Sequence, residues 1–158
     1  MSNINNKLPS HFKDFINELN RHQVEYMLIG GYALGVYGHI RATNDLDIYI
    51  KGTEVNASKM VQVCTDYGIP EASIEKNMFL VSKMIGIGEP PLRIEILKKL
   101  DIDFEYAFQR INKVTVDGIK INVVDSDDLI ILKQAAIRDR NSARDIEDLA
   151  FLLRLKNK

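Results

Sequence analysis

The chain has only one cysteine, Cys64, so an intrachain disulfide is excluded. The three histidines do not combine with this cysteine in any zinc-binding spacing. A formal net charge of −1 excludes a generally basic surface of the kind that binds duplex DNA tightly, although it leaves room for a local basic patch. No apolar run approaches the ~20 residues of a membrane span, and the polar first ten residues lack the apolar region of a signal peptide. We therefore expect a cytoplasmic protein with no part in a membrane.

What the chain does contain is typical of a globular protein. Hydrophobic residues make up 46% of the 158 residues and charged residues 27%, and no linker or repeat interrupts them, so we expect one domain over residues 1–158. Helical and strand patterns alternate along the chain. The expected helices fall near 8–23, 31–39, 53–68, 103–110, 125–139 and 142–156, and the expected strands near 24–31, 45–51, 78–88, 92–97 and 113–124. The pattern predicts an α+β fold with a central mixed sheet flanked by helices, the last two packed on one side or edge of it.

Local signals place several ends of these elements. Ser10, Thr53 and Ser126 each precede an expected helix and are predicted as N-caps. Gly68 is predicted to end the helix that Thr53 begins. Asp117 and the glycine after it predict a tight hairpin turn within 113–124.

The strand at 45–51 carries the most informative pattern in the chain. Asp45 and Asp47 are two residues apart, so both carboxylates project from the same face of the strand. Two such charges repel, and the pair needs either a proton or a bound cation. Glu95 alternates with apolar neighbours on the strand at 92–97 and is predicted as a third acid of the same site. Carboxylate oxygens suit Mg²⁺, with Mn²⁺ as an alternative, and three acids could hold two ions about 4 Å apart.

Two glycines stand before this acidic strand. Gly30 and Gly31 end one expected strand and open a helix, where backbone N–H groups can come close to an anion. Arg41 and Thr43 lie just ahead of the acids, within reach of a phosphate or of the loop that shapes the site. Arg41 fits a second role equally well, as a structural partner of acidic side chains. A nucleoside triphosphate with its metal ions would suit this combination of glycines and acids.

These residues together resemble the nucleotidyltransferase superfamily, which includes DNA polymerase beta. The shared pattern is Gly30-Gly31 at the start of a helix, Asp45-x-Asp47 on the next strand and Glu95 on a later one. The longer form resembles a small bacterial branch, some of whose members are nucleotidyltransferase halves of toxin–antitoxin systems. The C-terminal part is similar to that branch in a further set of residues: Lys133, Arg138, Arg140, Arg144, Asp145 and Asp148. The resemblance covers roughly residues 20–153.

The resemblance implies an enzyme that moves an NMP group from an NTP to a hydroxyl and releases pyrophosphate, with Mg²⁺ on Asp45, Asp47 and Glu95. The acceptor would be a protein side chain, an RNA 3′ end or a small molecule. Lys133 would contact the triphosphate or form an ion pair with Asp148. Because the third acid of the family is commonly aspartate, Glu95 leaves an alternative open: a catalytically silent nucleotide-binding or antitoxin-like protein that acts through a partner protein.

Overall fold

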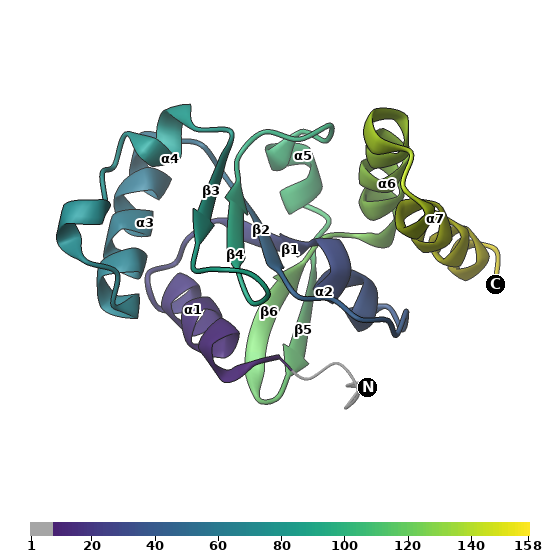
Figure 1. The fold of residues 1–158 in the computed structure, drawn as a ribbon, viewed down its shortest axis with the longest axis horizontal. Helices are drawn as coiled ribbons and strands as arrows, with labels where there is room; N and C mark the ends of the chain where they lie inside the picture. The colour runs from purple at the N-terminus through teal and green to yellow at the C-terminus, as the bar shows by residue number, and fades with distance from the viewer. Residues whose placement is uncertain (1–7) are drawn as a thin grey trace.

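In the computed structural model, which describes residues 8–158, helices surround one open six-stranded sheet (Figure 1). The strands are β1 (Tyr26–Ile29), β2 (Leu46–Ile50), β3 (Met84–Ile87), β4 (Ile94–Leu97), β5 (Asn112–Val116) and β6 (Ile119–Val123), in the order β3-β4-β2-β1-β6-β5. The helices are α1 (Ser10–Arg21), α2 (Gly30–Val36), α3 (Glu54–Tyr67), α4 (Met78–Val81), α5 (Phe104–Phe108), α6 (Ser126–Arg140) and α7 (Ala143–Lys156), with a 3-10 turn at Glu71–Ser73. The predicted α+β class with a mixed sheet is confirmed, whereas the single-domain organisation stays a prediction.

Most element ends follow the local signals, and three differ. Thr53 caps α3 as predicted, since its side chain accepts a hydrogen bond from the Asn56 N–H. Ser10 and Ser126 are instead the first residues of α1 and α6, whose caps are Pro9 and Asp125. The strand expected at 78–88 is also too long, because its first residues form α4 and only Met84–Ile87 pair with β4. An apolar run of this length fits a short helix as well as a strand.

The register of the sheet brings the predicted site together in one row. β1 and β2 are antiparallel and place Ile29 beside Asp47, while β2 and β4 are parallel and place Asp47 beside Glu95. Glu95 in turn faces Gly86 on β3. Because paired residues point to the same face, Asp47 and Glu95 project together. Leu97 follows two residues after Glu95 and therefore projects on the same side.

The two faces of the sheet differ in what they carry. One face holds the buried side chains of Leu46, Ile48, Ile94 and Ile96, which join the core with apolar residues of α1 and α3. The face of Asp47 also carries Tyr49, whose ring packs edge-on against Phe104 of α5 at 5.1 Å. Apolar core residues therefore cover both faces of the sheet up to Asp47 and Glu95, which form an acidic row together with Asp45.

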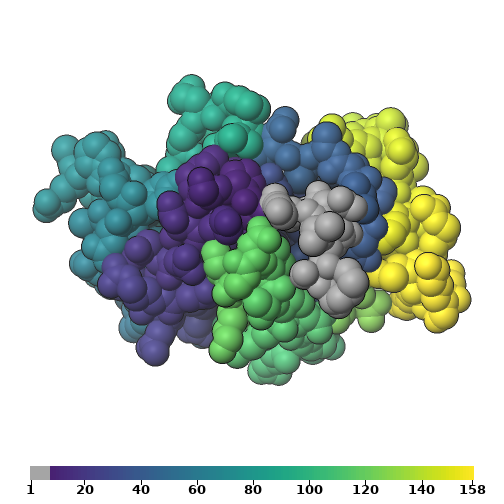
Figure 2. Space-filling model, turned by 90° about the horizontal axis from the view of Figure 1, so that it is seen from below, coloured from purple at the N-terminus to yellow at the C-terminus, as the bar shows by residue number. Residues whose placement is uncertain are grey.

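The C-terminal helices stand at one end of the sheet. α6 starts just after β6, and α6 and α7 pack mainly on each other (Figure 1). Figure 2 shows α7 in yellow against the blue segment that leads from α2 into β2. His39 stacks on Phe151 of α7 with ring centroids 4.6 Å apart. The helix pair thus forms one wall of a space at the end of the sheet where the acids lie.

Within residues 8–158, no helix combines the length and the apolar character needed to cross a membrane. Cys64 is buried in α3, and burial raises the pKa of its thiol to about 12. The only thiol of the chain is therefore protonated at neutral pH.

Candidate active site

One pocket of about 490 Å³ at the end of the sheet contains every residue singled out from the sequence as a site residue. These are Gly30, Gly31, Arg41, Thr43, Asp45, Asp47, Glu95 and Lys133. They come from β1–α2, from the segment before β2, from β4 and from α6. The structure adds Asn44, Arg140, Ser142, Arg144 and Asp145 to the lining. Residues far apart in the sequence thus meet in one cavity.

The electrostatics of the pocket centre on Asp47. Burial is the main reason that the pKa of Asp47 is raised to about 7, and the charges of Glu95 and Asp45 raise it further. A hydrogen bond with Glu95 acts in the same direction, whereas the charge of Lys133 lowers it. Burial and the neighbouring acids together outweigh Lys133, so a proton or a bound cation on Asp47 is favoured over a bare carboxylate. The pocket is therefore electrostatically prepared for a bound positive charge.

The donor set fits divalent magnesium by its chemistry. Asp45, Asp47 and Glu95 offer oxygen ligands only, which Mg²⁺ prefers. Asp47 and Glu95 are close enough to share a hydrogen bond, while Asp45 acts on Asp47 through its charge. The three carboxylates are not all within 4.8 Å of one another, so the arrangement differs from a preformed three-ligand cluster for one ion. This spacing suits carboxylates that are shared between two ions, or carboxylates that move closer together when an ion binds.

One other group in the described chain meets the spacing of a metal cluster. Glu18, His22 and Asp66 have ligand atoms within 4.8 Å of one another. The guanidinium of Arg21 already binds both carboxylates, at 2.7 Å from Glu18 and 2.5 Å from Asp66. This surface cluster is therefore balanced by an arginine and is separate from the pocket.

Gly30 and Gly31 lie so close to neighbouring side chains that no larger residue fits at either position. Gly30 has a φ of +74°, and a Cβ built there would come within 3.1 Å of the Cβ of Asp47. A Cβ on Gly31 would come within 2.7 Å of the Cβ of Thr43. Only glycine avoids both the left-handed strain at Gly30 and these contacts. The pair therefore forms an open floor beside Asp47 and Thr43.

We expect Gly30→Ala to displace Asp47 as well as to strain the backbone. Gly118 is a matched control, since it has a φ of +81° and no atom lies within 4 Å of the position that a Cβ would take there. Both substitutions should cost about 1–2 kcal/mol of the free energy of unfolding through backbone strain, measured by urea denaturation. Only Gly30→Ala should also weaken Mg²⁺ binding in calorimetry. Equal Mg²⁺ affinity in the two variants would contradict the close approach.

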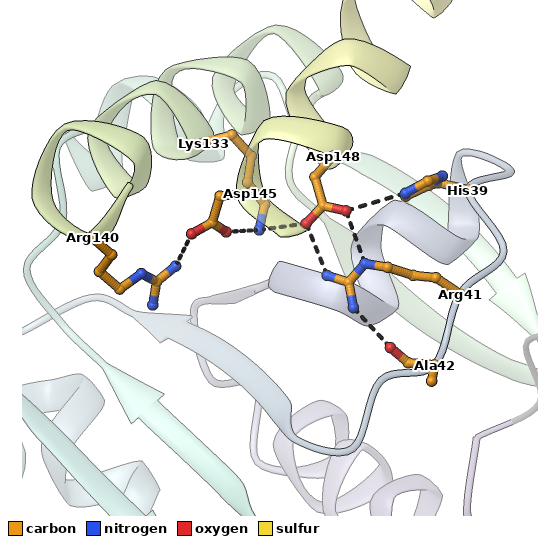
Figure 3. A network of polar contacts seen from close by, with 7 residues as sticks. All are labelled: His39, Arg41, Ala42, Lys133, Arg140, Asp145 and Asp148. Carbon is orange, nitrogen blue, oxygen red and sulfur yellow. Dashed lines mark hydrogen bonds and ion pairs between the residues drawn. The ribbon is translucent and has the colours of Figure 1, made fainter. Parts of the chain in front are cut away.

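A network of ions joins the wall of the pocket to α7 (Figure 3). Asp148, which is fully buried, accepts hydrogen bonds from Nε and Nη2 of Arg41 at 2.8 and 2.9 Å. The ammonium of Lys133 lies 2.9 Å from the same carboxylate, and Nε2 of His39 lies 3.1 Å from it. Burial alone would raise the pKa of Asp148, but the bonds from Arg41 and Lys133 outweigh it and lower this pKa. Asp148 is therefore an anion that holds three side chains in place.

A second carboxylate extends the network along α7. Asp145 binds Lys133 at 3.0 Å and Arg140 at 2.8 Å (Figure 3). Burial opposes its ionisation, but the bonds from Lys133 and Arg140 lower its pKa overall. Lys133 therefore forms the ion pair with Asp148 that the sequence left open, and it still faces the pocket.

His39 and Arg144 have roles in the structure that the sequence alone does not indicate. His39 is one of the three histidines without a zinc-binding spacing, yet it contacts Asp148, which lies more than a hundred residues away in the sequence. Arg144 has no ion pair among the described residues, although it lines the pocket beside three paired cations. The sequence indicates this network through the arginines and aspartates grouped at 138–148, the structural role open to Arg41 and the ion pair open to Lys133.

The raised pKa of Asp47 predicts how the metal-free protein responds to pH. Folded Asp47 binds a proton up to a pH of about 7, whereas the unfolded residue releases it near 3.8. The folded state holds more protons in this window, so the free energy of unfolding falls as pH rises through it. In EDTA, Asp47→Asn should therefore gain stability over wild type by on the order of 2 kcal/mol between pH 5 and pH 8. Urea denaturation at the two pH values measures this, and a pH-independent difference would contradict it.

The fold and this pocket together define a class of protein. Residues 7–156, nearly the whole chain, match the model of a family described as "Nucleotidyltransferase of unknown function (DUF6036)". The chain belongs to this nucleotidyltransferase family. The predicted membership of the nucleotidyltransferase superfamily is thereby confirmed, while the closer likeness to toxin–antitoxin members stays a prediction. No curated protein matches the sequence.

Solved structures of low sequence identity share the fold. The lincosamide antibiotic adenylyltransferase LnuA, solved with lincomycin bound, is 13% identical, with a TM-score of 0.61, 94% of this chain covered and 98% of that one. An antigenic nucleotidyltransferase-like protein from Paracoccidioides brasiliensis is 15% identical, with a TM-score of 0.59 and coverage of 90% and 73%. A protein from Thermotoga maritima (TM1012), classed provisionally as a nucleotidyltransferase, is 16% identical, with a TM-score of 0.54 and coverage of 92% and 90%. These likenesses concern the fold.

Proposed function

We propose that the protein is a Mg²⁺-dependent nucleotidyltransferase that moves an NMP group from an NTP to a hydroxyl acceptor and releases pyrophosphate. The observation that carries this proposal is the meeting of Asp45, Asp47 and Glu95 with Gly30 and Gly31 in one pocket. The raised pKa of Asp47 supports it, because burial and the neighbouring acids disfavour a bare carboxylate there and a bound cation would relieve this. The family model supports the same class of reaction.

The three acids would hold the magnesium ions, with Mn²⁺ as a substitute. Bound there, the ions would neutralise phosphate charge and align the attacking and leaving oxygens. Asp45 and Asp47 would be ligands, and Glu95 would be a ligand or would take the acceptor proton. Glu95 lies beside Asp47 in the register of the sheet, so it is placed for either role.

The triphosphate would lie over the glycine floor. Gly30 and Gly31 have no side chains to keep it from the backbone N–H groups, and the Thr43 hydroxyl is adjacent. Arg41 and Lys133 would act on it as fixed positive charges, because Asp148 holds both in place. Arg144 is the pocket cation with no carboxylate partner in the described chain, and we add it as a direct phosphate contact.

Labelled NTPs test this reaction directly. With α-³²P-labelled NTPs, Mg²⁺ and a cell extract as the source of acceptors, label should pass to an acceptor. With γ-³²P label it should appear only in pyrophosphate, and EDTA should abolish both transfers. Transfer of the γ-label to an acceptor would identify a kinase and overturn the proposal.

The alternative is a nucleotide-binding protein without turnover, antitoxin-like in its use of a partner protein. The contacts of Glu95 favour it, since Nε of Arg93 lies 3.8 Å from its carboxylate and competes for it. In this case NTPs should bind in calorimetry, while neither the α- nor the γ-label moves.

A further inference from the structure

A second cavity opens from the proposed NTP pocket. It has a volume of about 420 Å³ and lies between α6 and the segment that follows β4. The two cavities share Gly30, Asp47, Glu95, Lys133 and Arg140. Asp47 and Glu95 thus lie where the two cavities join, whereas Asp45 lines the first alone. A molecule in the second cavity would contact Glu95 and Asp47, whereas Thr43 and Arg41 line only the first.

Unlike the first cavity, the second has an aliphatic wall beside its charged residues. Its apolar lining includes Leu97, Leu100, Leu129, Leu132, Ala135 and Ala136. Leu97 projects from the same face of β4 as Glu95, so the apolar wall begins directly beside the third acid. None of these six apolar residues lines the first cavity, whose own part is polar and includes Arg41, Thr43 and Asn44. The site therefore divides into a half suited to phosphates and a half suited to an apolar body.

Several classes of ligand do not fit the second cavity. Its lining in the described chain has no aromatic side chain on which a base could stack and no asparagine or glutamine to read a base edge. Lys99 lines it together with the acidic Asp101 and Asp139, so this lining offers no continuous basic track for an RNA backbone. Arg138 binds Asp101 at 2.7 Å and further balances this rim. The nucleoside and the RNA 3′ end are both disfavoured.

We infer that this cavity is the acceptor site and that the acceptor is a small alcohol with an apolar body. The inference rests on the proposed function and deepens it. A volume of about 420 Å³ is within the usual range for small-molecule sites. The acceptor oxygen would form a bond to the α-phosphorus, the bond from that phosphorus to the bridging oxygen would break, and pyrophosphate would leave. The hydroxyl proton would pass to Glu95 or to water.

Filling the cavity tests this assignment. Ala136 lines it and is only partly buried, so Ala136→Leu adds bulk there with little cost to folding. Gln134→Leu is the matched control, because Gln134 is an exposed residue of the same helix outside both cavities. Each variant is incubated with α-³²P-labelled NTPs, Mg²⁺ and a cell extract separated by a 3 kDa filter into filtrate and retained macromolecules. NTP affinity is measured in parallel by calorimetry.

We expect label to enter compounds of the filtrate, at least tenfold more slowly with Ala136→Leu, while Gln134→Leu equals wild type and NTP affinity is unchanged in both. Label found only on retained protein or RNA would overturn the inference and leave the proposed function intact. Weaker NTP binding by Ala136→Leu would also overturn it, because the cavity would then hold the nucleoside. Absence of transfer to any fraction would remove the proposed function and this inference with it.

Discussion

Asp47→Asn is expected to lower kcat/KM for NMP transfer by on the order of 1000-fold, the loss of about 4 kcal/mol of transition-state stabilisation. Asparagine keeps the shape of the side chain but removes the charge at the most buried point of the acidic row. The variant should remain folded, and in the absence of metal it should be more stable than wild type at pH 8. Rates of label transfer and urea denaturation on the same preparation measure both effects.

Asp14→Asn is the control for this change, since Asp14 is an exposed residue of α1 outside the pocket. It should leave the transfer rate and Mg²⁺ affinity at wild-type values. An Asp47→Asn protein with full transfer activity would show that the chemistry lies elsewhere in the chain. A loss of activity accompanied by loss of stability would point to misfolding, which the parallel denaturation detects.

Asp148→Ala should have the largest effect on stability of any change in the site. It leaves Arg41 and Lys133 without the carboxylate that binds both, in a place where Asp148 itself has no exposed surface. Removing one partner from a buried ion pair typically costs 3–5 kcal/mol, so roughly 4 kcal/mol is expected here. For a chain of this size the loss lowers Tm by about 10 °C, which calorimetry measures.

Glu147→Ala provides the comparison within the same turn of α7. Glu147 is exposed and has no ion pair among the described residues, so its Tm should stay within about 1 °C of wild type. Asp148→Ala should also weaken NTP binding, because Arg41 and Lys133 are no longer held. A Tm change of similar size in the two variants would show that the network adds little to stability.

The acidic row could be predicted from the sequence because its causes are local and repetitive. Alternation on β2 and β4 fixes which side chains share a face, and the glycines before β2 mark a close approach of the chain. Thr53 is a predictable cap for the same reason, since the bond it accepts comes from three residues away. The family pattern agrees with the one long-range expectation, that Asp47 and Glu95 belong to the same site.

The full ion network and the second cavity could not be predicted in this way, although an ion pair with Asp148 was one of two roles expected for Lys133. Asp148 meets Arg41 across 107 positions, and nothing near either residue indicates the distance between them in space. The cavity wall likewise uses leucines and alanines of α6 that read in the sequence as ordinary core positions. Local competition explains the smaller errors: Asp125, one residue earlier, caps α6 in place of Ser126.

The buried, protonated Cys64 makes the natural chain nearly inert to maleimide dyes, which react with thiolates. A cysteine placed on the outer face of α7, as in Ile146→Cys, would then carry the only fluorophore. Emission from such a reporter would follow the C-terminal helices in real time as nucleotide is added.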